Sequence, residues 1–301
     1  MKQIVMIAFI AGWLGIVVSA QGATSILIDS EIRLGHPWTS IHHQEKESIR
    51  GMLNYLLRSP NAKKVMAAAR RKAASYGKTL VDVIDGGDVS LTDTTLIRRF
   101  YRDHPNQVMM ESRSKIFLNR HLNAFDAMLD LIHELTHFAY RHDFNPYRLD
   151  FSLENFITSI IEGEGGEVDA YLTECRVVQD LFPKRLASGD SCHQVFDPQT
   201  RKLSRKWGIK QFYRIGQFYP HYQDLLLRHK VPASSFPHLS SQEPIFISSA
   251  YSLPYPVAAV KEYLAIVNRT CANESNRIKA LNVTGSRTPS SLSLHCQSRQ
   301  D

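Results

Sequence analysis

Residues 124–141 read AFDAMLDLIHELTHFAYR, and they are the most informative stretch of this 301-residue chain. Apolar side chains recur here at the spacing of one helix face, and neither proline nor glycine interrupts the run. Asn123, directly before the stretch, is a suitable N-cap residue. The pattern therefore predicts a helix with an apolar stripe formed by Phe125, Met128, Leu129, Ile132, Leu135 and Ala139.

His133, Glu134 and His137 form the motif H-E-x-x-H on this predicted helix. Histidines at i and i+4 lie on the same helix face, so both imidazoles can reach one zinc ion. A carboxylate beside that zinc can take a proton from the bound water, whose pKa the metal lowers from about 15.7 to near 7. We expect a Zn²⁺ cofactor, with Glu134 as the catalytic base of a metallopeptidase.

The metzincin class of zinc peptidases does not fit the residues that follow the motif. Its pattern requires glycine and a further histidine where this chain has Tyr140 and Asp143. It also requires a methionine turn after the zinc helix, but the last methionine, Met128, precedes the motif. The third ligand must therefore come from elsewhere.

Residues 162–174, EGEGGEVDAYLTE, contain the strongest candidates for that ligand. Residues 167–170 resemble the E-x-E-A-D type of segment that carries the third zinc ligand in small gluzincins. The resemblance implies Glu167 as the ligand, with His133 and His137, while Glu164 and Glu162 remain alternatives. His142, just past the helix end, is better explained as a partner of the helix dipole.

The resemblance is interrupted at Tyr171, which replaces the Asp or Asn that orients a zinc histidine in the family. Tyr171, Asp130 or Asp169 could take that role, and spacing does not choose among them. Spacing also selects none of the candidates for binding the oxyanion, which are Tyr219, His221, Tyr222, His229, Tyr251 and Tyr255.

Residues 108–119, VMMESRSKIFLN, are closer to a strand pattern than to a helix pattern. In gluzincin-like folds a small sheet precedes the active-site helix, and its edge strand binds the extended substrate. Further helices are expected over 44–58, 62–75, 209–218, 222–227 and 256–268, and a hairpin turning at 85–88. The fold class is thus α+β, mainly helical, with a small sheet preceding the H-E-x-x-H helix.

The N-terminus has the features of a secretory signal. An apolar run over 4–18 is followed by Ser19 and Ala20, so cleavage is expected after Ala20, with Ala23 and an uncleaved anchor as alternatives. The predicted organisation is a signal peptide over 1–20, an N-terminal helical region over 24–107, a metallopeptidase core over 108–185, a C-terminal helical region over 186–283 and a Ser/Thr-rich tail over 284–301. The mature protein should be secreted or periplasmic.

The four cysteines contain no C-x-x-C pair, which argues against a cysteine zinc site and allows disulfides in an exported chain. Three pairings are possible. Sequence proximity favours Cys175 with Cys192 and Cys271 with Cys296.

The chain is basic, with a formal net charge of +7, and its 43% hydrophobic content allows a folded core. Residues 184–230 contain ten Lys and Arg but only three Asp. This segment could form a surface that binds an anionic envelope polymer, although a solvated basic face explains the composition more simply. We expect a protein or peptide substrate and no specific recognition of nucleic acid. The alternatives are a zinc hydrolase of cell-wall peptides and a noncatalytic secreted protein that binds zinc or the envelope.

Overall fold

The computed structural model describes residues 34–100, 108–148, 150–187, 191–280 and Cys296. The predicted signal peptide over 1–20 lies outside the described residues, and so does the predicted tail over 284–301 apart from Cys296. Within the described part, helices predominate and the strands form one sheet of three and one of two. The predicted α+β, mainly helical class is confirmed.

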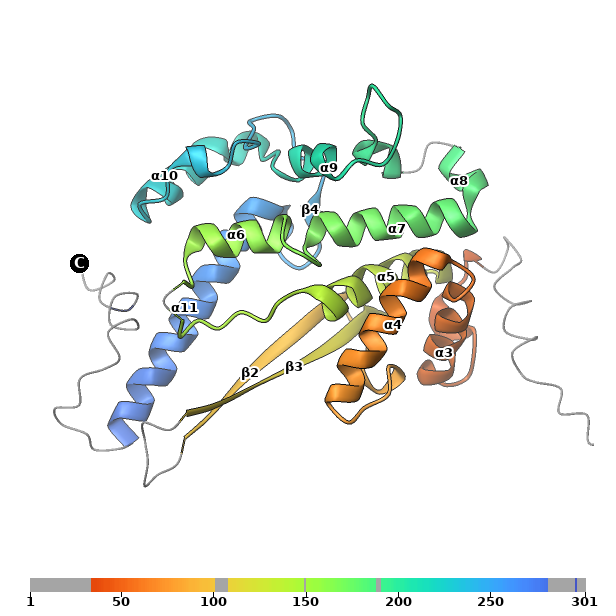
Figure 1. Ribbon diagram of the computed structural model, residues 1–301, viewed down its shortest axis with the longest axis horizontal. Helices are drawn as coiled ribbons and strands as arrows, with labels where there is room; N and C mark the ends of the chain where they lie inside the picture. The colour runs from red at the N-terminus through yellow and green to blue at the C-terminus, as the bar shows by residue number, and fades with distance from the viewer. Residues whose placement is uncertain (1–33, 101–107, 149, 188–190, 281–295, 297–301) are drawn as a thin grey trace, which may run out of the picture.

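The larger sheet contains the predicted strand over 108–119, which is β3 (Val108–Asn119). Its order is β1-β3-β2, so β3 is the central strand. The long outer strand β2 (Leu91–Phe100) runs antiparallel to β3 through the whole register, and β1 (Ile84–Gly87) pairs with the end of β3 in parallel. Figure 1 shows β2 and β3 as a long ribbon beneath the helices.

The hairpin expected at 85–88 is not formed, because the glycine-rich residues belong to β1 itself. A Cβ atom on Gly86 would lie 2.7 Å from Nε of Arg120 and 2.8 Å from a carboxylate oxygen of Glu45, two side chains that form an ion pair. Gly86 leaves space beside the strand for this pair and does not reverse the chain.

The other predicted helices are present with shifted ends, but the helix predicted over 209–218 is wrong beyond Phe212, where the observed helix ends and only the 3-10 turn η4 (Gly216–Phe218) follows. On the N-terminal side they are α3 (Glu45–Leu56), α4 (Pro60–Ser75) and α5 (Ala124–Tyr140), and on the C-terminal side α9 (Arg205–Phe212), α10 (Tyr219–Arg228) and α11 (Tyr255–Ala280). α6 (Leu153–Ile161) was not among the expected helices, while α7 (Glu167–Leu181) begins within the acidic segment over 162–174 and α8 (Pro183–Ala187) follows it. Short 3-10 turns, including η3 (Ser191–Val195), connect them, and β4 (Ile247–Ser248) pairs with β5 (Leu253–Pro254) before α11.

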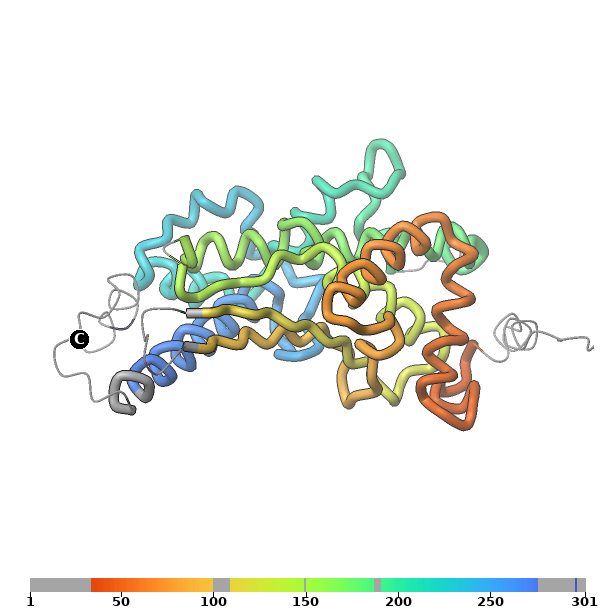
Figure 2. The backbone as a smooth tube through the Cα atoms, turned by 60° about the horizontal axis from the view of Figure 1, so that its bottom comes forward, coloured from red at the N-terminus to blue at the C-terminus, as the bar shows by residue number. Residues whose placement is uncertain are grey.

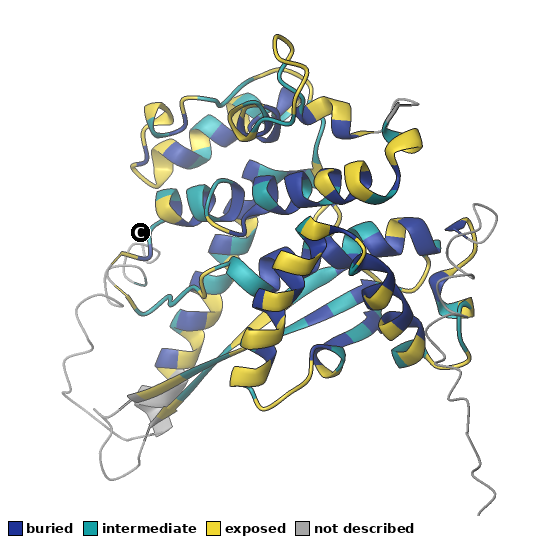
Figure 3. Ribbon diagram, turned by 45° about the vertical axis from the view of Figure 1, so that its right-hand side comes forward, coloured by how far each residue is buried: buried dark blue, intermediate teal, exposed yellow. Residues whose placement is uncertain are grey.

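Helix α5 lies at the centre of the fold. It packs against α4 and α7 and lies on the sheet, mainly against β3. Its apolar stripe is buried, as expected, with Met128, Ile132 and Leu135 fully enclosed. Burial of such side chains contributes about 1.5–3 kcal/mol each, so this helix is a rigid platform for the residues it carries. Figure 3 shows the buried faces of the helices turned toward this centre and exposed residues on the outer faces.

The N-terminal helices and the far end of α11 lie at opposite ends of the molecule, as the tube in Figure 2 shows. Disulfides join Cys175 of α7 to Cys192 of η3, and Cys271 of α11 to Cys296, so the predicted pairing is confirmed. Disulfides of this kind belong to oxidising compartments such as the cell exterior. Among the described helices, none combines the length and the hydropathy that a bilayer crossing requires.

Candidate metal centre

The two histidines of the H-E-x-x-H motif lie one turn apart on α5, and their rings meet edge to face with centroids 4.6 Å apart. The helix begins where the sequence predicts, since the side chain of Asn123 accepts a hydrogen bond from the backbone N–H of Asp126. His137 and Glu134 are buried and His133 is nearly so. The motif thus faces the interior of the fold.

A glycine turn brings the next helix to this face. Gly165 has a φ of +66°, and a Cβ atom there would lie 2.5 Å from the backbone nitrogen of Arg141, at the end of α5. Glycine is required for both reasons, because other residues strain at this φ and would collide with α5. The turn ends at Gly166, the N-cap of α7, so Glu167 becomes the first residue of that helix.

His133, His137 and Glu167 form one cluster whose candidate ligand atoms all lie within 4.8 Å of one another. Oε2 of Glu167 is 3.2 Å from Nε2 of His133, and Oε1 is 3.4 Å from Nε2 of His137. Glu164 instead is exposed beside His142, and Glu162 accepts a hydrogen bond from Tyr213. Of the three glutamates considered, Glu167 is the one that joins the histidines.

The other nitrogen of each histidine is occupied by the protein. Nδ1 of His137 donates to the carbonyl of Gly165 at 2.7 Å, and Nδ1 of His133 hydrogen-bonds the carboxylate of Glu174. Engagement of Nδ1 turns the Nε2 atom of each ring toward Glu167, and such a hydrogen bond is how proteins fix the orientation of a metal-binding histidine. The cluster therefore fits a metal ion, and two nitrogens with one carboxylate are a ligand set typical of catalytic zinc.

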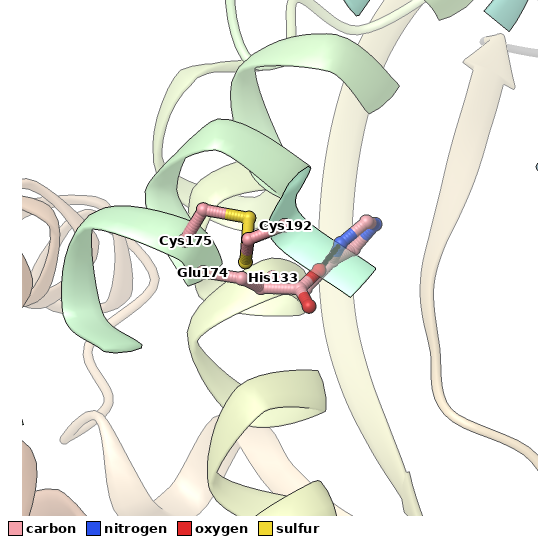
Figure 4. The surroundings of a disulfide bond; sticks show 4 residues. All are labelled: His133, Glu174, Cys175 and Cys192. Atoms are coloured by element: carbon pink, nitrogen blue, oxygen red, sulfur yellow. Dashed lines mark hydrogen bonds and ion pairs between the residues drawn. A yellow bond between two sulfur atoms is a disulfide. The ribbon is translucent and has the colours of Figure 1, made fainter. Parts of the chain in front are cut away.

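Glu174 was missed by the sequence reasoning, which left the orienting partner open among Tyr171, Asp130 and Asp169. Its position, two helical turns after Glu167, places both carboxylates on the same face of α7, and this spacing was the available signal. Tyr171 instead packs against Phe246. Figure 4 shows Glu174 and His133 pointing toward each other beside the Cys175–Cys192 disulfide.

The electrostatics of the cluster are strongly coupled. Burial acts to lower the pKa of His133, but the charges of Glu174 and Glu167 outweigh it, and the pKa lies well above 6.5. Burial raises the pKa of Glu174 to about 7, since His133 offsets only part of the desolvation. The pKa of Glu167 is held well below its usual range because the two histidines and Arg141 outweigh its burial.

Glu134 lies beside the cluster and is held from the sheet. Oγ1 of Thr92, on the outer strand β2, is 2.7 Å from Oε2 of Glu134 and 3.0 Å from its backbone carbonyl oxygen. Sequence reasoning did not identify Thr92, because nothing in a strand pattern predicts which residue faces a neighbouring helix. The contact fixes the carboxylate and shows that β2 passes directly by the site.

Two further side chains meet Glu167. Arg141, at the end of α5, donates to Oε1 of Glu167 at 2.9 Å and lies 3.3 Å from Nε2 of His137. The hydroxyl of Tyr255, at the start of α11, hydrogen-bonds Glu167. Burial, with the nearby charges of Glu167, Glu174 and Glu134, raises the pKa of Tyr255 well above 10, so this phenol stays protonated at neutral pH.

Of the six residues considered for oxyanion binding, Tyr255 is the one placed beside Glu167. Tyr222 is buried against Phe236, and Tyr219 hydrogen-bonds Gln223 on its own helix.

No protein-family model, no curated protein and no solved structure matches this chain. His133, His137 and Glu167 could hold a metal ion.

Proposed function

We propose that the chain is a zinc-dependent metallopeptidase of the gluzincin type, with His133, His137 and Glu167 as zinc ligands and Glu134 as general base. The observation that carries the proposal is the orientation of the two imidazoles, whose Nδ1 atoms are engaged by Gly165 and Glu174 while both Nε2 atoms face Glu167. A helix with two surface histidines has no need of such partners.

The bound zinc would supply Lewis acidity, which polarises the scissile carbonyl and makes a water molecule acidic near neutral pH. Glu134 would accept a proton from the attacking water and pass it to the leaving amine. Thr92 holds Glu134 through Oε2, which leaves Oε1 of the carboxylate for proton transfer. Tyr255, protonated and next to Glu167, is placed to donate a hydrogen bond to the developing oxyanion.

The outer strand β2 provides a place for an extended peptide. It pairs with β3 along one edge over its whole length, and no described strand pairs with its other edge. A peptide that adds to this edge gains main-chain hydrogen bonds, and Thr92 connects the strand to the general base. We infer a protein or peptide substrate bound as a further strand, cleaved outside the cytoplasm after signal-peptide removal.

The test compares hydrolysis of a mixed peptide pool by wild type, Glu134→Gln and Glu164→Gln after zinc loading. Loss of the base should reduce the rate about 100-fold or more, while zinc content stays at the wild-type level. The Glu164→Gln control removes one exposed carboxylate from the same segment of the chain and should retain full activity.

If Glu134→Gln cleaves as fast as wild type, the peptidase proposal fails. If wild type binds zinc and cleaves neither linear peptides nor cell-wall peptides, the noncatalytic alternative replaces it.

A further inference from the structure

A cavity apart from the metal cluster lies between η3, the loop over 196–203, α9 and the segment over 242–245. It has a volume of about 440 Å³ and is open to solvent on one side. Its walls include the apolar faces of Phe196, Trp207 and Ile245, and none of its lining residues belongs to the metal cluster.

Three basic side chains line this cavity: His193, Arg201 and Arg214. Neither arginine forms an ion pair with a carboxylate of the described residues. Nε of Arg214 is buried and meets no hydrogen-bond acceptor there, although its Nη1 donates to Gln211 at 3.1 Å. A buried donor without an acceptor is uncommon, and a missing water molecule or anion is a frequent explanation.

Asp197 is the one acidic residue that lines the cavity, and it does not neutralise the arginines. Its Oδ1 accepts the backbone N–H groups of Gln199 and Thr200, both at 2.9 Å, which ties the carboxylate into its own turn. The same loop and helix carry exposed lysines (Lys202, Lys206 and Lys210), which add positive charge to this part of the chain, and Nζ of Lys210 lies 5.7 Å from the ring centroid of Trp207.

Arg201 occupies an unusual backbone conformation for an arginine, with a φ of 55°. The loop that imposes it is closed by a bridge between Phe196 and Leu203 and by the hydrogen bond from the N–H of Arg201 to the carbonyl of Asp197. Glycine or asparagine would adopt this conformation with less strain. This turn fixes the backbone of Arg201, whose exposed side chain lines the rim of the cavity.

We propose that this cavity binds an organic anion, in which a carboxylate or phosphate group meets Arg201 and Arg214 and an apolar, flat body lies against Trp207 and Phe196. Guanidinium groups bind both oxyanions through paired hydrogen bonds. The aromatic walls offer apolar contact area to an organic anion, and inorganic phosphate has no apolar surface that could use it. The site is independent of the peptidase proposal, since it shares no residue with the metal cluster.

The test is isothermal titration of the zinc-loaded full chain with phenyl phosphate, benzoate, inorganic phosphate and benzyl alcohol. Phenyl phosphate or benzoate should bind saturably and more tightly than inorganic phosphate, and the neutral alcohol should not bind. The ratio of the affinities for phenyl phosphate and benzoate identifies which oxyanion the site prefers.

Two variants separate binding from folding. Arg201→Gly relieves the backbone strain, so the melting temperature should stay or rise while the affinity for the preferred anion falls about tenfold or more. Arg228→Gln removes the same charge from exposed α10, outside the cavity, and should change affinity less than about twofold, as expected for a screened surface charge. No saturable binding of either aromatic anion, or equal effects of the two substitutions, would overturn the proposal.

Discussion

At the scale of single residues, His133 and His137 have opposite electrostatic surroundings. The carboxylates of Glu174 and Glu167 outweigh burial and raise the pKa of His133, whereas burial and the charge of Arg141 lower the pKa of His137. Without metal, His133 is therefore protonated on both ring nitrogens near neutral pH, whereas His137 is neutral. Zinc binding must displace the proton of His133, which couples metal affinity to pH.

Apparent zinc affinity should rise with pH below the folded-state pKa of His133, by about tenfold per pH unit for one displaced proton. Zinc affinity rises with pH because the pKa of His133 is raised in the metal-free fold. Protonated His133 stabilises the metal-free protein fully below pH 6.5, and this stabilisation is lost as the pH rises through the folded-state pKa. Competition with a chelator between pH 6 and pH 8 measures the slope. A flat profile would show that His133 carries no proton to displace.

Replacing Glu174 tests the partner that sequence reasoning missed. Glu174→Gln should weaken zinc affinity about 10-fold to 100-fold, because the amide orients His133 less strongly and no longer raises its basicity. The pKa of His133 should fall in the same variant, which can be followed by NMR. Glu164→Gln is the control, and equal zinc affinities of the two variants would remove Glu174 from the site.

At the scale of elements, the turn before α7 sets the distance between the two helices that carry the site. Gly165→Ala should destabilise the metal-free fold by about 1–3 kcal/mol, because the new Cβ meets Arg141 and the residue keeps a positive φ. Gly77→Ala is a matched control: Gly77 also has a positive φ, at +69°, but a Cβ there meets nothing within 4 Å. Gly77→Ala should lower the free energy of unfolding by about 1 kcal/mol, from backbone strain alone.

Urea denaturation of both variants checks this difference. If Gly165→Ala is no less stable than Gly77→Ala, contact between the turn and the end of α5 does not fix the site.

The elements also show how far the sequence alone predicts this structure. Helix α5 and strand β3 are predicted because their periodicity is local and their residues repeat it over many positions. The role of Glu167 in the cluster is predicted from a short resemblance. The sequence does not predict the positions of three further residues, Glu174, Thr92 and Tyr255, because each reaches the site through packing between distant segments. The predicted hairpin at 85–88 is wrong for the same reason, since residues 84–87 pair in parallel with the distant residues 116–119 of β3.

At the scale of the whole molecule, the disulfides attach outlying segments to the helices of the core. Cys175 and Cys192 are separated by 17 residues and join η3 to the helix that carries Glu167 and Glu174. Replacing both with alanine should lower the free energy of unfolding by about 3 kcal/mol, the value expected for a closed loop of this length. Urea denaturation of this variant and of wild type, both without reductant, measures the difference.

The second disulfide serves as the comparison. Cys271→Ala with Cys296→Ala acts on the far end of the chain and should leave zinc affinity unchanged. Loss of zinc affinity in this variant, with none in the Cys175/Cys192 variant, would contradict the assignment of α7 to the site.

The most direct test of the account is the metal content of the purified mature protein, measured by inductively coupled plasma mass spectrometry for wild type and Glu167→Ala. We expect one zinc per chain in wild type and little in the variant, because His133 and His137 alone leave a two-ligand site that binds weakly. Circular dichroism of both proteins confirms that they are folded. A well-folded wild type that holds no zinc, even after incubation with the metal, would contradict the central claim.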